Sequence, residues 1–110
     1  MLPTHKREDA AVQEAHLAWG RERSRRWLGM LDENIIGTNA YLCGNEISIA
    51  DCLGIGMLSV GEVAQLDYAQ GPNLTRWIAT MKARPTWAKV NEGFCAYFVA
   101  PYKDAPFKGL

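Results

Sequence analysis

The chain has 110 residues, a length that suits one domain better than two. Hydrophobic residues make up 48% of it and charged residues 22%, which is the composition of an ordinary globular protein and excludes a disordered one. Twelve basic and twelve acidic residues cancel, so no net positive charge draws the chain towards nucleic acid or an anionic membrane.

Targeting segments and metal-binding patterns are not found in the sequence. The first residues hold no apolar run of the secretory kind, and no stretch approaches the roughly 20 apolar residues of a membrane span. The three cysteines, Cys43, Cys52 and Cys95, are odd in number and have no C-x-x-C spacing. We therefore expect no disulfide framework and no zinc or other metal site, and we expect a reduced, cytoplasmic protein.

The first predicted helix runs from about residue 7 to residue 36, a stretch with no proline and many good helix formers. At 100° per residue, its core-facing stripe comprises Leu17, Gly20, Ser24, Trp27, Leu28, Leu31 and Ile35. Gly20 and Ser24 on this stripe would allow another helix to pack closely. Gly37 is expected to end the helix, because glycine is the usual residue beyond a helix C-terminus.

The second predicted helix spans about residues 48 to 66, after a loop whose turn is placed at Gly44-Asn45. It is apolar nearly all round, which predicts that it forms the buried centre of the domain. Three glycines each lower its helix propensity by roughly 1 kcal/mol. We expect them to let neighbouring elements approach closely: Gly54, Gly56 and Gly61.

Two more helices are framed by prolines. Between Pro72 and Pro85, apolar residues recur at i, i+3, i+4 and i+7: Leu74, Trp77, Ile78 and Met81. The last predicted helix, about residues 86 to 99, repeats the pattern with Trp87, Val90, Phe94, Tyr97 and Phe98. Residues 1–8 and 100–110 are expected to be loose tails. No alternating strand pattern occurs, so the predicted fold class is all-α, a four-helix bundle.

A helix-capping motif stands at the start of the second helix. Ser48 and Asp51 have the spacing of a capping box in which aspartate takes the place of the usual Glu or Gln. The Ser48 side chain would accept from the Asp51 amide, while the Asp51 carboxylate reaches back to the Ser48 amide. Ile47 could form a hydrophobic staple with Cys52. This motif starts a helix and does no chemistry.

A second stripe on the first helix, which we call the outer stripe, lies on the side away from the core-facing stripe. It holds apolar residues with arginines beside them: Val12, Trp19, Arg23, Arg26 and Met30. Together with Arg21 and Arg25, these two arginines make four within six residues, and such a cluster is typical of a solvated helix face. Arginine also pairs with carboxylates and stacks on aromatic rings, and a tryptophan is not expected on an idle surface. The outer stripe is therefore the candidate substrate-pocket or partner-contact surface.

No catalytic set is apparent among the remaining residues. The two histidines, His5 and His16, lie near the start of the chain and make a poor triad with any serine and aspartate. Cys43 lies in a loop and could be a reactive thiol, but a small semi-buried cysteine is the more frequent case. We assign no catalytic residue.

Three segments resemble glutathione transferases, in the order in which that family has them. The segment Tyr41 to Asp51, YLCGNEISIAD, is similar to the family signature YL-G-(D/N)-x-(I/L)-(S/T)-I-A-D. Pro72 to Trp77, PNLTRW, resembles its P-N-(L/V)-x-R-W helix start, and Arg84 to Trp87, RPTW, resembles its R-P-(S/T)-(W/F) joint. The strong match runs from about residue 27 to residue 98. Each motif alone is weak, but the ordered set is specific.

This resemblance implies the fold of the helical C-terminal domain of that family, in which the capping box opens the central core helix. Full-length members begin with a thioredoxin-like domain, which supplies most contacts to glutathione and the activating Ser, Tyr or Cys. The sequence shows no such domain, and it is expected to start after the first helix of the helical domain. No catalytic residue is therefore carried over, no cofactor is expected in this chain, and glutathione is implied only for a full-length relative.

For function, the resemblance implies part of a transferase that acts on electrophilic small molecules, inactive alone. In the family this domain contributes to the hydrophobic substrate pocket and the dimer contact. We expect a homodimer through the first helix, with a thioredoxin-like domain of another chain as a further candidate partner, and neither nucleic acid nor a membrane.

Two alternatives stay open. The chain could be a non-catalytic interaction module, because similar domains serve as assembly units in translation-factor and synthetase complexes. Trp19 could also fold against residues 100–110, which would leave a monomer.

Overall fold

The computed structural model describes residues 9–104 and is helical over that range. Its main helices are α1 (Ala10–Met30), α2 (Ile49–Val63), α3 (Pro72–Lys82) and α4 (Pro85–Phe94). Wider π-helical stretches extend two of them: η2 (Leu31–Ile36) continues α1, and η3 (Cys95–Val99) continues α4. A short 3-10 helix, η4 (Ala100–Tyr102), follows. The predicted all-α class with four main helices is confirmed.

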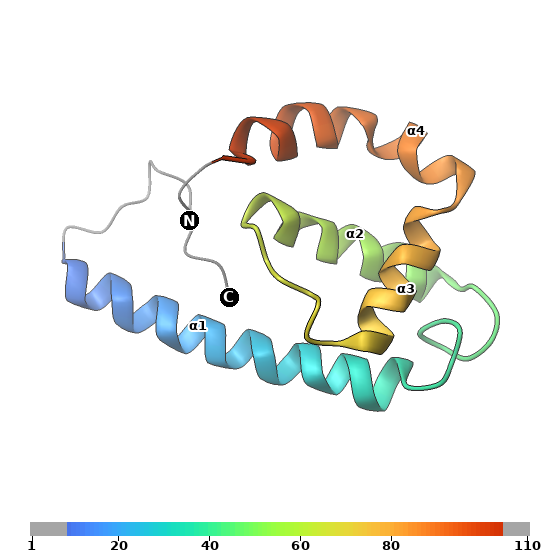
Figure 1. Cartoon of the computed structure of the whole chain (residues 1–110), viewed down its shortest axis with the longest axis horizontal. Helices are drawn as coiled ribbons and strands as arrows, with labels where there is room; N and C mark the ends of the chain where they lie inside the picture. The colour runs from blue at the N-terminus through green and yellow to red at the C-terminus, as the bar shows by residue number, and fades with distance from the viewer. Residues whose placement is uncertain (1–8, 105–110) are drawn as a thin grey trace.

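The arrangement of the helices is open (Figure 1). The helix α2 runs between α1, along the lower edge of the view, and α4, along the upper edge, while α3 lies beside η2 and leads into α4. Contacts between α3 and η2 are the most extensive between any two elements that are not consecutive in the described chain. The body of the domain is therefore centred on α3.

Local sequence explains where the helices begin and end. Asp9 caps α1, because its carboxylate accepts from the amides of Ala11 and Val12 at 2.9 and 3.2 Å. Gly37 ends η2 with a φ of +46°, a conformation that favours glycine, as predicted. Pro72 and Pro85 occupy the first turns of α3 and α4, where a missing N–H costs nothing.

The loop before α2 turns earlier than predicted. Tyr41 and Gly44 exchange backbone hydrogen bonds of 2.8 and 3.4 Å, so the tight turn consists of Leu42 and Cys43 rather than Gly44-Asn45. Gly44 closes it with a φ of +124°, which an L side chain rarely adopts.

The buried core is small and lies mainly under α3. Its apolar members are Ile36, Ile55, Leu74, Trp77 and Met81. The three on α3 recur at i, i+3 and i+7, so the predicted amphipathic face of that helix is confirmed. Ile36 and Ile55 pack onto this face from η2 and α2.

None of the seven residues of the predicted core-facing stripe of the first helix is buried, and two of them are exposed. The exposed fraction of Trp27 is 56% and that of Ile35 is 45%, while Asp32 and Ile36 are buried instead. A π-helical stretch has more residues per turn than an α-helix, so the side chains of η2 leave the 100° stripe. No buried residue lies on α1 itself, and within residues 9–104 no other element comes within 4 Å of a Cβ built on Gly20, so the expected close helix contact is not present there.

The helix α2 is not buried all round, which corrects the prediction. Ile55 and Ser59 are buried, but Ile49, Leu53, Met57 and Val60 are 87, 67, 68 and 57% exposed. These four recur at i, i+4, i+8 and i+11 and form one stripe, the α2 apolar face. The neighbouring α3 covers the opposite side of α2, and burial depends on such neighbours as much as on composition.

The helix α4 and its extension also expose apolar side chains that the pattern assigned to a core face. Val90, Tyr97 and Phe98 are exposed, and α4 has no buried residue. Phe94 and Phe98 stack on each other with their ring centroids 5.9 Å apart. Beyond η3, the Gln65 amide donates to the carbonyls of Tyr102 and Lys103, at 3.0 Å each, which ties this part of the chain to the end of α2.

Two of the three glycines of α2 lie at close contacts, as predicted. A Cβ at Gly54 would lie 2.9 Å from Leu42 Cδ1 and 3.3 Å from the Trp77 ring, and one at Gly61 would collide with the Tyr68 hydroxyl. Among the described residues, no other element comes within 4 Å of a Cβ built on Gly56, so the prediction is wrong there. The close approach at Gly61 allows the Tyr68 hydroxyl to donate to the Leu58 carbonyl at 2.7 Å.

Candidate functional site

The residues of the outer stripe all lie on α1 and are all exposed. Trp19 is 61% exposed, and Val12 and Met30 are close to 40%. Their positions fall within one third of the helix circumference at 100° per residue, together with Arg23 and Arg26. The Arg23 guanidinium lies over the Trp19 ring, 5.3 Å from its centroid, a cation–π contact. The structure therefore brings the predicted contact residues onto one solvent-facing surface.

The capping box is present, and its carboxylate accepts more hydrogen bonds than the sequence indicates. Asp51 Oδ2 accepts from the Ser48 amide and the Ser48 hydroxyl, each at 2.9 Å. Asp51 Oδ1 accepts from the Leu42 amide at 2.9 Å and from the Trp77 indole at 2.8 Å. Asp51 therefore joins α2 to the preceding loop and to α3. The staple between Ile47 and Cys52 stays a prediction.

The carboxyl of Asp51 is fully buried and stays ionised. Burial by itself would raise its pKa, but the hydrogen bonds from Leu42, Trp77 and Ser48 outweigh burial, so the pKa lies below the ordinary value of 3.8. The cause is that all four donors stabilise the charged form. The role of Asp51 in the described structure is structural, as predicted.

Asp32, which sequence reasoning did not single out, performs a similar task at the start of α3. Its Oδ1 accepts from the Leu74 amide at 2.6 Å, and its Oδ2 lies 3.3 Å from the Asn73 side-chain amide. The residue at the N-cap of α3 is Gly71, which has no side chain to cap the helix. Asp32 supplies this cap from 42 positions away in sequence, and its negative charge suits a helix N-terminus.

The sequence contains features that relate to the role of Asp32 as the cap of α3, but they are hard to interpret. An acidic residue stands among the apolar positions at the end of the first helix, and Gly71-Pro72 leaves the next-but-one helix without a side-chain cap. Nothing in either segment alone links the two. A close approach at Gly71 is also required, since a Cβ there would lie 2.8 Å from Asp32 Oδ1.

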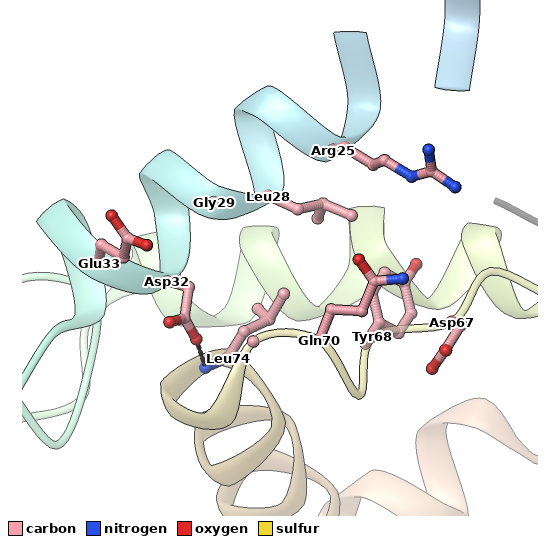
Figure 2. Close-up of a pocket in the computed structure, with 10 residues that line it drawn as sticks. Arg25, Leu28, Gly29, Asp32, Glu33, Asp67, Tyr68, Gln70 and Leu74 are labelled. Carbon is pink, nitrogen blue, oxygen red and sulfur yellow. Dashed lines mark hydrogen bonds between the residues drawn. The ribbon is translucent and has the colours of Figure 1, made fainter. Parts of the chain in front are cut away.

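A pocket of about 150 Å³ lies between the end of α1, η2, the connection that follows α2 and the start of α3 (Figure 2). Its apolar part comes from Leu28, Leu74 and the ring of Tyr68, with Gly29 and Gly71 beside them. Its polar part consists of Arg25, Asp32, Glu33, Asp67 and Gln70. None of the five outer-stripe residues lines it.

The chemistry of the pocket is set by its charged groups. Asp32 is committed to capping α3, and burial, with the Glu62 carboxylate as a second cause, raises the pKa of Tyr68 to about 12. The Tyr68 phenol is therefore protonated and donates to Leu58. Arg25, Glu33 and Asp67 remain as charges at the rim, and no ion pair is found at any of them within residues 9–104.

No group of three or more His, Cys, Asp or Glu side chains between residues 9 and 104 is arranged to hold a metal ion. Cys43, Cys52 and Cys95 are free and exposed. No helix in the described range is both long and apolar enough to cross a membrane.

Comparison with known proteins gives one match. The family model for the glutathione S-transferase, C-terminal domain matches residues 3–85. The matched range ends at the first residue of α4 and includes the capping box, Asp32 and the start of α3. No curated protein and no solved structure matches the chain.

Proposed function

The chain belongs to the glutathione S-transferase C-terminal domain family, and on this premise we propose that it acts as a helical contact domain, without transfer chemistry of its own. In a transferase-type assembly it would provide the dimer contact and part of the hydrophobic substrate pocket. The observation that carries the proposal is the outer stripe of α1, where an exposed tryptophan is flanked by exposed aliphatic residues and arginines.

We infer that the partner on the outer stripe is a second copy of the chain. Tryptophan and arginine are the residues that most often dominate binding energy in protein interfaces. A two-fold arrangement would place Trp19 of each copy against the same surface of the other, so the apolar stripe would be buried twice. Arg26 could pair across the axis with Glu22, although an exposed pair of this kind adds little.

Trp19→Ala should weaken this dimer about 30-fold or more, because truncating a central interface tryptophan commonly costs 2 kcal/mol or more. Sedimentation equilibrium of wild type and variant measures the change. Leu53→Ala, on the α2 apolar face, is the matched control and should leave the dimer unchanged. If Leu53→Ala dissociates the dimer and Trp19→Ala does not, the contact lies on α2 instead.

The proposal also predicts that the chain alone does not conjugate glutathione. Thiol transfer needs groups that lower the thiol pKa and hold the glutathione carboxylates in one place. A conjugation assay with a chloronitrobenzene substrate should give the rate of the uncatalysed reaction. Clear turnover by the isolated chain would contradict this part of the proposal, whatever the oligomeric state.

A non-catalytic assembly module of the same fold is the second candidate function. The α2 apolar face favours it, because four exposed aliphatic residues in one stripe form a second surface that the dimer through α1 would leave uncovered. Adding a thioredoxin-like domain to the conjugation assay distinguishes the two candidates. Restored turnover favours the transferase assembly, and none favours the module.

A further inference from the structure

One further residue of α1, His16, lies on the same side of the helix as the outer stripe. It is exposed, and at 100° per residue it falls in the same third of the circumference. With it, successive members of the surface are four, three, four, three and four residues apart: Val12, His16, Trp19, Arg23, Arg26 and Met30. Alternating steps of three and four residues are the spacing along which two helices pack as a coiled coil.

This spacing is the same in both chain directions about its midpoint at position 21. An antiparallel two-fold pairing of α1 with α1 of a second copy would therefore place each of the six residues opposite another of them. Val12 would face Met30, so apolar side chains meet at both ends. Trp19 would face Arg23, and arginine stacks on this indole ring already within one chain, 5.3 Å from the ring centroid. A parallel pairing would place each residue against its own copy, arginine against arginine.

The third pair of this arrangement joins His16 of one copy to Arg26 of the other. Within its own chain, His16 has no charged residue three or four positions away on α1. On its side of the helix the nearest charged residues, Asp9 and Arg23, are each two turns away. Figure 1 shows α1 along one edge of the described chain, with α2, α3 and α4 all to one side of it. No ion pair is found at His16 within residues 9–104.

The charges close to His16 in the dimer would therefore belong to the second copy. Arg26 of that copy would lie opposite, and its Arg23 would lie about one turn further along. Glu22 of that copy precedes Arg26 by one turn, but it lies about 40° further round the helix, away from the outer stripe. The surface that faces His16 is therefore positively charged.

We propose that two copies of the chain pair antiparallel through α1, in the register that places His16 opposite Arg26, and that acid dissociates them. This register rests on the dimer proposed above and adds its orientation and its control. Histidine is the side chain that ordinarily gains its positive charge between pH 8 and pH 5. Charged His16 would face a guanidinium group on each side of the two-fold axis, and like charges repel. The dimer therefore binds fewer protons than two separate chains, so a falling pH favours the separate chains.

The first test measures the dissociation constant of the dimer by sedimentation equilibrium at about pH 7.5 and about pH 5.5. The wild-type dimer should be about tenfold weaker at the lower pH, since two pairs of like charges oppose it. His16→Gln should keep the dimer at the higher pH and lose the change, because glutamine does not titrate. His5→Gln is the matched control, because it removes the other histidine of the chain and should leave the change as in wild type. Both pH values lie above the range in which Asp51 is protonated, so the fold is kept.

The second test determines the register with a charge reversal. In Arg26→Glu a carboxylate would lie opposite His16 and attract its charged form, so this dimer should become about tenfold tighter as the pH falls. The matched control, Arg25→Glu, makes the same change of charge outside the outer stripe and should keep the weakening in acid. In a parallel dimer His16 would face His16, so Arg26→Glu would not reverse the effect of pH.

The outcomes distinguish this register from the dimer itself. A wild-type chain that stays a single copy at about pH 7.5 contradicts the dimer, and the register with it. A dimer whose dissociation constant does not change with pH, or changes equally in His16→Gln, contradicts the register and leaves the dimer standing. The same conclusion follows if Arg26→Glu and Arg25→Glu respond alike to acid.

Discussion

Replacing Asp51 by alanine is expected to lower the free energy of unfolding by about 3–5 kcal/mol, one of the largest effects of any single substitution. The carboxylate accepts four hydrogen bonds in a fully buried position, from Leu42, Trp77 and twice from Ser48. Alanine would leave these donors without a partner and would also remove the cap of α2. Urea unfolding monitored by tryptophan fluorescence measures the loss.

The matched control is Asp9→Ala, which removes the exposed cap of α1 and should cost only about 1 kcal/mol. Acid adds a second check. Because the pKa of Asp51 is lowered by folding, its contribution is present above about pH 4 and is lost as the pH falls through the lowered pKa. Asp51→Asn should flatten this fall. A loss for Asp51→Ala no larger than that for Asp9→Ala would show that the carboxylate does not join α2 to α3.

Replacing Asp32 by alanine should lower the free energy of unfolding by about 2–3 kcal/mol, because the buried Leu74 amide would lose its acceptor. The N-terminus of α3 would also lose the negative charge that favours it. Since α3 carries most of the core, we expect the whole domain to become less stable rather than α3 alone to fray. Urea midpoints from far-ultraviolet circular dichroism and from tryptophan fluorescence should shift together.

Glu33→Ala is the control, because Glu33 is the exposed neighbour of Asp32 in η2 and makes none of these bonds. Its effect should stay within about 0.5 kcal/mol, as for most surface substitutions. Asp32→Asn keeps one carbonyl oxygen for the Leu74 amide and should recover part of the loss. If Asp32→Ala were as mild as Glu33→Ala, the cap supplied by η2 would not contribute to stability.

Signals that are local in sequence predicted much of the fold. The four helices, the glycine stop at Gly37, the prolines that open α3 and α4, and the capping box at Ser48 all depend on residues a few positions apart. Each of these features needs only hydrogen bonds or backbone angles within one turn of helix. Patterns of this kind are visible without knowledge of any neighbour.

Burial was harder to predict, because it depends on what packs against a helix. The pattern of α2 is apolar on all sides, yet Leu53 and Met57 are exposed while Ile55 is buried, since α3 covers one side of the helix. In the first helix, the change to π-helical winding at Leu31 moved burial from Ile35 to Ile36. The 3.6-residue period of a sequence does not show which side of a helix a neighbour covers or where the helical winding changes.

The pocket and the cap at α3 could not be predicted, because they join distant segments. Asp32 and Leu74 are 42 residues apart, and the residues that line the pocket come from the end of α1, from η2, from the connection after α2 and from the start of α3. The outer stripe was predicted as a surface because it needs only the period of one helix. The sequence of one chain does not show which molecule this surface contacts. The contact is proposed because Trp19 is exposed and has arginines beside it.

The most direct test of the contact function is the mass of the wild-type chain in solution. The chain has a mass of 12.3 kDa, and light scattering over a dilution series distinguishes one copy from two. The proposal predicts twice the chain mass at high concentration, falling towards the chain mass on dilution. A wild-type chain that keeps the mass of one copy at hundreds of micromolar, a concentration at which even weak specific dimers form, would contradict the proposal.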